Sequence, residues 1–205
     1  MTPLFESLTD YVHDLDPHIS AERQQAVEPL INYIQKKVDA NEDVNLIFIC
    51  THNSRRSHLA QVWAQTLAEY YNLAKTTCYS GGTESTALYP EAGASLSRAG
   101  FEVRALSEGN NPVYSIKFAP SKSPVIGFSK SFDHDFNPAN NFAAIMVCSH
   151  AEENCPFVPG AEARIALPFD DPKDFDNTPQ KSAKYDERCR EIANELLFAF
   201  SSIKK

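Results

Sequence analysis

The chain has 205 residues, of which 42% are hydrophobic and 22% are charged, a composition typical of a globular protein of ordinary domain size. The net charge of -8 argues against nucleic acid or an anionic membrane as a partner. No apolar run reaches the roughly 18 residues of a membrane span, and the acidic N-terminal stretch does not resemble a signal peptide. We therefore expect a cytoplasmic protein whose five cysteines form no structural disulfide framework.

The first 42 residues are predicted to form a helical extension that packs on the core. Apolar residues recur at helical spacing from Val27 to Val38. Ser20 is a candidate N-cap, and Pro29 is expected to begin a new helix or to kink this one. Residues 43–205 are predicted to form one α/β domain.

Strands and helices alternate along that domain. The continuous apolar run from Val44 to Cys50 is typical of a central parallel strand that is buried on both faces. Further strands are expected at 77–80, 142–148 and 164–169, and helices at 57–71, 90–99 and 181–203. This alternation predicts a parallel α/β sheet.

An insert interrupts the pattern at about residues 109–139. Two short segments, around Ile116 and Ile126, alternate apolar and polar residues, and Pro120 and Pro124 lie between them. The spacing predicts a β-hairpin-like insert, without indicating its function.

The most informative stretch is the loop Cys50-Thr-His-Asn-Ser-Arg-Arg-Ser57, which joins the first strand to a helix. Ligands bind beyond the carboxyl ends of strands in open α/β sheets, and backbone N–H groups at a helix N-terminus cradle an oxyanion there. Arg56 can donate to two of its oxygens. The positive field of the helix N-terminus and of Arg56 also favours a thiolate at Cys50, which a hydroxyl of Ser54 or Ser57 can stabilise.

We therefore expect Cys50 to be a nucleophile aimed at a bound oxyanion, with Asn53 bracing the loop. A buried cysteine beside surface arginines is the alternative. The expected oxyanion-binding residues are Thr51, His52, Asn53, Ser54, Arg55, Arg56 and Ser57.

The motif CTHNSRRS resembles the loop of low-molecular-weight protein tyrosine phosphatases and of the related thioredoxin-coupled arsenate reductases. The resemblance covers about residues 44–203 and implies a doubly wound domain with a central four-stranded parallel sheet flanked by helices. His52 stands where glycine is usual, so a positive φ is expected there. Arg55 stands where a cysteine is frequent. Gln61 replaces a glutamate common in the reductases, which counts against a cation-binding feature that some of them use.

The segment Phe169-Asp-Asp-Pro172 follows an expected strand. The resemblance implies that Asp171 is the acid that protonates the leaving group, with Asp170 as the fallback. A simple turn is the alternative reading.

Cys148 and Cys155, seven positions apart, resemble the second and third cysteines of the reductases. The resemblance implies a thiol relay from Cys50 through Cys148 to Cys155. Alternatives are a core cysteine with a surface cysteine, or zinc ligands together with His150. The zinc spacing is not standard and lacks a fourth ligand, so we expect no metal and no cofactor.

The leading hypothesis is an enzyme that reduces arsenate to arsenite, coupled to thioredoxin or a similar dithiol. The alternative is a phosphomonoester hydrolase that works through a phosphocysteine intermediate. A third possibility is an oxyanion-binding or redox-sensing module without turnover. Elsewhere we expect a solvated His58, a core position for Trp63, and packing roles for Cys78 and Cys189.

Overall fold

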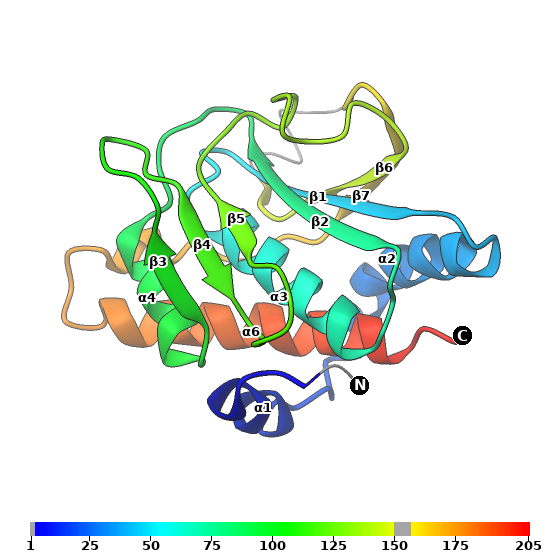
Figure 1. The fold of residues 1–205 in the computed structure, drawn as a ribbon, viewed down its shortest axis with the longest axis horizontal. Coiled ribbons are helices and arrows are strands. Elements are labelled where there is room, and N and C mark those ends of the chain that lie inside the picture. The colour runs from blue at the N-terminus through cyan, green and yellow to red at the C-terminus, as the bar shows by residue number, and fades with distance from the viewer. Residues whose placement is uncertain (1–2, 150–156) are drawn as a thin grey trace.

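A computed structural model describes residues 3–149 and 157–205 (Figure 1). The helices are α1 (Glu6–His13), α2 (Ala21–Asp39), α3 (Arg56–Tyr70), α4 (Pro90–Arg98), the 3₁₀ helix η1 (Pro172–Phe175) and α6 (Lys181–Ser201). The strands are β1 (Val44–Cys50), β2 (Thr76–Gly82), β3 (Glu102–Ala105), β4 (Tyr114–Lys117), β5 (Val125–Gly127), β6 (Phe142–Met146) and β7 (Ala161–Ala166).

The central sheet has four parallel strands in the order β2-β1-β6-β7, as expected for the doubly wound α/β class. From β1, the chain adds β2 on one side and then β6 and β7 on the other. The strand order therefore reverses between β1 and β6, and ligands bind at such a point in open α/β sheets. Cys50 ends β1 at this edge, and Cys148 follows β6 two residues after its end.

The last strand of this sheet begins earlier than predicted. Strand β7 spans Ala161–Ala166 rather than 164–169, because its residues alternate in exposure and carry no continuous apolar run. The backbone nevertheless continues beside β6, since Leu167 donates to the carbonyl of Met146 at 2.9 Å and Phe169 to that of Val147 at 3.2 Å. This continuation delivers the Asp170–Asp171 segment to the carboxyl edge of the sheet.

A second sheet has three antiparallel strands in the order β3-β4-β5. The predicted hairpin is confirmed, because β4 pairs with β5 and Ile116 lies opposite Val125. Strand β3 was not predicted, since its residues are exposed or half-buried and show no apolar alternation. The hairpin of the insert therefore joins a strand from outside it.

The N-terminal residues pack on the core. Ser20 caps α2, accepting from the backbone N–H of Arg23 at 3.2 Å. The expectation of a new helix at Pro29 is wrong, because α2 runs through it and buries Leu30 and Ile34 beyond it. The ring of Tyr11 in α1 stacks on Trp63 with centroids 5.5 Å apart. The division of the chain at residue 42 stays a prediction.

The core lies between the sheet and the helices α2, α3 and α6, which run below the sheet in Figure 1. Trp63 is fully buried there, as predicted, and donates its indole N–H to the sulfur of Cys189 at 3.1 Å. Burial raises the pKa of the Cys189 thiol to about 11 and also raises that of Cys78. Both cysteines therefore pack as predicted. No helix in the described ranges is long and apolar enough to cross a membrane.

Candidate active site

The loop after β1 places a sulfur atom beside a hydroxyl. Cys50 Sγ lies 3.1 Å from Ser57 Oγ in the first turn of α3, and both side chains are buried. The side-chain amide of Asn53 donates to the same Ser57 oxygen at 2.9 Å. Because that oxygen already accepts from Asn53, the Ser57 hydroxyl proton is available to the sulfur. The Ser57 hydroxyl is thus placed to donate a hydrogen bond to the Cys50 sulfur.

The backbone of the loop turns its carbonyl groups toward neighbouring segments. Thr51 O accepts from Glu84 N at 2.8 Å, and Ser54 O accepts from Tyr89 N at 2.9 Å. Within residues 3–149 and 157–205, no backbone N–H from His52 to Arg56 donates to a protein acceptor. Unpaired N–H groups at the start of a helix are the feature that binds an oxyanion.

Asn53 carries the unusual backbone conformation of this loop. Its φ is +43°, whereas His52 has no positive φ. The prediction for His52 is therefore wrong by one position. Asparagine tolerates this conformation better than most residues, and here its side chain also gains hydrogen bonds that hold the turn. Gly82 of β2 lies so close that an added Cβ would sit 2.7 Å from the Asn53 nitrogen.

The insert supports the loop from behind. Asn53 Oδ1 accepts from the backbone N–H of Lys130 at 2.9 Å, and the Ser129 hydroxyl donates to His52 O at 2.9 Å. Gly82 links β2 to the same segment, because its N–H donates to Lys130 O at 2.9 Å. Residues 129–130 thus fix the loop that carries Cys50, a role that nothing in their sequence indicated.

Arg56 joins the loop to the Asp171 segment. Its Nη1 donates to Phe169 O at 2.8 Å, and its Nη2 forms an ion pair with the Asp171 carboxylate. The Nε–H of Arg56 is buried and has no hydrogen-bond partner among the described residues. A buried donor without a partner is costly, so this group is suited to a bound oxyanion. Asp170 points outward instead, with its side chain 96% exposed.

Cys148 lies beside the same loop. Its Sγ is 3.6 Å from the hydroxyl of Thr51, the residue that directly follows Cys50. The strand register explains this neighbourhood, because Ile49 pairs with Met146 and Val147 donates to Ile49 O at 2.9 Å. The segment with Cys155 and His150 lies outside the described residues. The structure therefore brings Cys50, Cys148, Arg56 and Asp171 to one edge of the sheet.

Comparisons with known proteins identify the family. No family model matches the chain. An arsenate reductase from Bacillus cereus (strain 03BB102) is 29% identical over 160 residues, covering 77% of this chain and 94% of the relative. One from Bacillus anthracis (strain A0248) is 30% identical over 129 residues, covering 62% of this chain and 75% of the relative. The chain belongs to the family of these arsenate reductases, and it is an enzyme.

Two solved structures share the enzyme's fold. An arsenate reductase solved in its phosphate-binding state has a TM-score of 0.51 and 18% identity, covering 78% of this chain and 99% of its own. A low-molecular-weight phosphotyrosine phosphatase from Vibrio cholerae O395 has a TM-score of 0.53 and 13% identity, covering 78% and 95%. The chain is longer than the part that these proteins cover, and the boundaries of the N-terminal extension and of the insert stay predictions.

Arg55 differs from the other predicted oxyanion ligands of the enzyme, because its guanidinium is held elsewhere. Its Nε donates to the hydroxyl of Tyr185 and its Nη2 to the carboxylate of Asp176, each at 2.6 Å. Its Cζ also lies 4.1 Å from the centre of the Tyr89 ring. The backbone N–H of Arg55 is still predicted to bind the oxyanion, whereas the Arg55 side chain makes its contacts elsewhere.

Two buried titratable groups lie behind the loop of the enzyme. His58 is fully buried, so the prediction of a solvated histidine is wrong, and its Nε2 lies 2.9 Å from Asn53 O. Burial, with the charge of Lys130 as a second cause, lowers the pKa of His58 to about 3. Lys130 is 1% exposed, and its Nζ contacts Phe128 O at 3.4 Å. Burial lowers the pKa of Lys130 to about 8.

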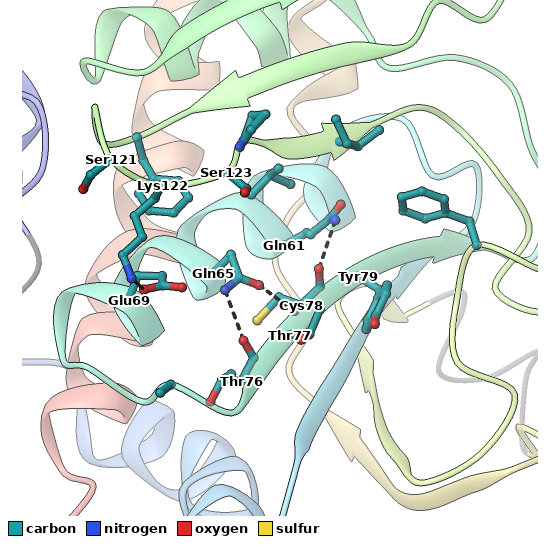
Figure 2. A pocket seen from close by; sticks show the side chains of 16 residues that line it. Gln61, Gln65, Glu69, Thr76, Thr77, Cys78, Tyr79, Ser121, Lys122 and Ser123 are labelled. Atoms are coloured by element: carbon teal, nitrogen blue, oxygen red, sulfur yellow. Dashed lines mark hydrogen bonds and ion pairs between the residues drawn. The ribbon is translucent and has the colours of Figure 1, made fainter.

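A separate cavity of about 450 Å³ lies between α3, β2 and the insert, away from the loop (Figure 2). There Gln61 donates to Cys78 O at 3.1 Å, and Gln65 bonds both Thr76 O and Cys78 N. These amides cover the outer edge of β2 in place of a further strand. Gln61 Oε1 is buried with no hydrogen-bond partner among the described residues. Those residues also contain no group of three His, Cys, Asp or Glu side chains that could hold a metal ion.

The sequence prediction missed the residues that support the site rather than those that form it. These residues contact the loop from 77 or more positions away in the chain: Ser129, Lys130, Asp176 and Tyr185. No local pattern marks them.

Proposed function

We propose that the enzyme reduces arsenate to arsenite through a relay of Cys50, Cys148 and Cys155. The observation that carries the proposal is the position of Cys148, whose sulfur lies 3.6 Å from the hydroxyl of the residue after Cys50. A simple phosphatase needs no second cysteine at the mouth of its loop. The curated relatives that support the proposal are arsenate reductases.

The first half of the proposed reaction forms a bond between sulfur and arsenic. The loop N–H groups and Arg56 Nε bind arsenate, and the Cys50 thiolate attacks the arsenic atom. Asp171 gives a proton to the departing hydroxide, which leaves as water. An arsenate reductase of the same fold adopts a phosphate-binding state, which supports a tetrahedral oxyanion in the loop.

The second half transfers two electrons. The Cys148 thiolate attacks the Cys50 sulfur, the S–As bond breaks, and its electron pair stays on arsenic, which leaves as arsenite. Cys155 then attacks the Cys148 sulfur and releases the Cys50 thiolate. Thioredoxin or a similar dithiol reduces the remaining Cys148–Cys155 disulfide. Because this cycle needs a reducing compartment, the proposal places the enzyme in the cytoplasm.

The second candidate is hydrolysis of a phosphomonoester through a phosphocysteine at Cys50. The ion pair between Arg56 and Asp171 favours it, since it holds a carboxyl group beside the oxyanion donors. In this reaction Asp171 protonates the leaving oxygen, and Cys148 protects Cys50 from oxidation.

Parallel turnover assays on wild type and Cys148→Ser distinguish the two reactions. One assay follows NADPH consumption with arsenate, thioredoxin and thioredoxin reductase, and the other follows hydrolysis of an aryl phosphate. The relay predicts that Cys148→Ser abolishes arsenate reduction and spares any aryl phosphatase activity. Cys78→Ser, which changes a buried thiol away from the loop, is the matched control.

Strong phosphatase activity that survives Cys148→Ser, with no arsenate-dependent NADPH consumption by wild type, would overturn the reductase proposal. Asp171→Asn tests both enzymatic mechanisms, because each uses Asp171 as the general acid. Either mechanism predicts a loss of roughly 100-fold or more in kcat, whereas a module without turnover has no activity to lose.

A further inference from the structure

The two successive arginines of the loop contact the same downstream segment at different points. Arg56 binds Phe169 O and the Asp171 carboxylate. Arg55 binds Asp176. Asp171 caps the N-terminus of η1, and Asp176 caps its C-terminus. The short helix that follows the proposed acid is therefore anchored at both ends to the loop that carries Cys50.

The Arg55 anchor is a closed network. Arg55 donates to Tyr185 OH and to Asp176 Oδ2, and Tyr185 OH donates to Asp176 Oδ1, all at 2.6 Å. The Arg55 and Asp176 side chains are only 12% and 14% exposed, and Tyr185 is fully buried. Burial and the bond to Asp176 raise the pKa of Tyr185, so its phenol keeps the proton that it donates. Each of the three side chains is therefore hydrogen-bonded to the other two.

Aromatic rings fix the orientation of the guanidinium. The Tyr89 ring lies 4.1 Å from Arg55 Cζ and stacks on Tyr185, with centroids 5.6 Å apart. Tyr89 N also donates to Ser54 O in the loop. A planar, five-donor guanidinium fits this site, whereas a lysine ammonium lacks the two coplanar donors that reach Tyr185 and Asp176.

We propose that Arg55 is a positioning residue, which holds the Asp171 segment against the oxyanion loop through Asp176 and Tyr185. The proposal rests on the proposed role of Asp171 as the acid. The Arg55 side chain does not bind the oxyanion. It sets the distance between the acid and the leaving group, and a displacement of about 1 Å at such a position costs on the order of 100-fold in rate.

Two measurements on Arg55→Lys test this inference. The first is hydrogen exchange of the peptide that spans residues 169–180, which requires no activity. We expect exchange at least roughly tenfold faster in that peptide than in wild type, because an anchor of η1 is lost. The second is steady-state kinetics on whichever substrate wild type turns over. A fall of roughly tenfold or more in kcat with an unchanged KM is expected.

Tyr185→Phe and Asp176→Asn serve as further variants in case Arg55→Lys does not fold. Tyr185→Phe removes two of the three bonds and keeps the ring that stacks on Tyr89. Arg98→Lys is the matched control, since Arg98 binds Asp186 of the same helix α6 but lies on the surface. We expect it to match wild type in both measurements.

The outcomes separate this inference from the proposed function. Unchanged exchange at 169–180 overturns the inference, whatever the enzyme turns over. A rise in KM alone also overturns it, because that result assigns the Arg55 side chain to substrate binding. Absence of any turnover by wild type contradicts the proposed function, and the exchange measurement still decides the anchoring role of Arg55.

Discussion

The backbone N–H of Lys130 donates to the side-chain oxygen of Asn53 at 2.9 Å, across 77 positions of the chain. This bond connects the insert to the loop that carries Cys50. Asn53 simultaneously donates to Ser57, which contacts the Cys50 sulfur. The Asn53 side chain therefore links the insert to Ser57, the residue whose hydroxyl lies beside the Cys50 sulfur.

Asn53→Gly tests this connection. Glycine adopts a φ of +43° without strain but removes both side-chain hydrogen-bonding atoms, Oδ1 and Nδ2. We expect a loss of about 1–3 kcal/mol in the free energy of unfolding, measured in urea, because Lys130 N is left buried without a partner. Activity should fall as well, since Ser57 loses its orientation. A variant as stable and as active as wild type would show that the bond is dispensable.

Lys130→Met tests the cost of the buried ammonium. The pKa of Lys130 is lowered from 10.5 in the unfolded chain to about 8, so between these pH values the unfolded chain binds more protons. The free energy of unfolding therefore rises with pH across that window, and at pH 7 the burial of the charge costs about 3 kcal/mol. Contacts with the Phe128 and Phe136 rings offset part of this cost.

We expect Lys130→Met to be more stable than wild type at pH 7 and to lose the rise in stability between pH 8 and 10.5. Urea unfolding at several pH values measures both quantities. Lys75→Met, at an exposed position, is the matched control and should retain the wild-type pH dependence. A destabilised Lys130→Met with an unchanged pH profile would contradict the assignment of a costly buried charge.

Much of the fold could be predicted from local patterns in the sequence, but the distant residues that hold the loop in place could not. The run from Val44 to Cys50 predicted a central strand because it is apolar on both faces, and β1 is buried along nearly its whole length. Strand β3 escaped prediction because it is an exposed strand stabilised by its partner β4. Pro29 was predicted to begin a new helix or to kink this one, and no new helix begins there because tertiary packing of α2 overrides the preference of proline.

The site divides in the same way. Cys50, Arg56 and Ser57 lie within eight consecutive positions, so the loop could be recognised from its sequence. The direction of the Arg55 side chain depends on Asp176 and Tyr185, more than 100 positions away, as the separations of 121 and 130 show. Long-range contacts of this kind leave no periodic signal in the chain.

His58→Gln tests the buried imidazole. Burial lowers the pKa of His58 from 6.5 to about 3, so at acid pH the unfolded chain binds a proton that the folded protein does not. Wild type therefore loses stability as the pH falls from about 6.5 toward 3. Glutamine keeps a donor for Asn53 O and does not titrate, so the variant should lose less stability across this range.

The measurement is the urea midpoint of wild type and His58→Gln at pH 7, 6, 5 and 4. Other groups also titrate there, but they are common to both proteins, and the difference isolates His58. His13→Gln, exposed at the end of α1, should show the wild-type dependence. Parallel curves for wild type and His58→Gln would mean that the histidine is protonated in the folded protein.

A buried ion pair joins α2 to α6. Arg23 of α2 binds Glu195 of α6 through two bonds of 2.7 Å, and the Glu195 side chain is only 3% exposed. Burial raises the pKa of Glu195, with Arg23 opposing that shift. Arg23→Leu leaves this carboxylate buried without its partner, so we expect a loss of about 3–5 kcal/mol in the free energy of unfolding.

The double variant Arg23→Leu/Glu195→Leu should recover most of that loss, because well-packed apolar residues replace a buried ion pair at little cost. Arg190→Leu removes a second pair, with Asp14, that lies on the surface and should cost at most about 1 kcal/mol. Urea unfolding of wild type, Arg23→Leu, Glu195→Leu and the double variant measures the coupling of Arg23 with Glu195. A loss below about 1 kcal/mol in Arg23→Leu would mean that apolar residues such as Leu30 and Ile34 alone hold α2 on the core.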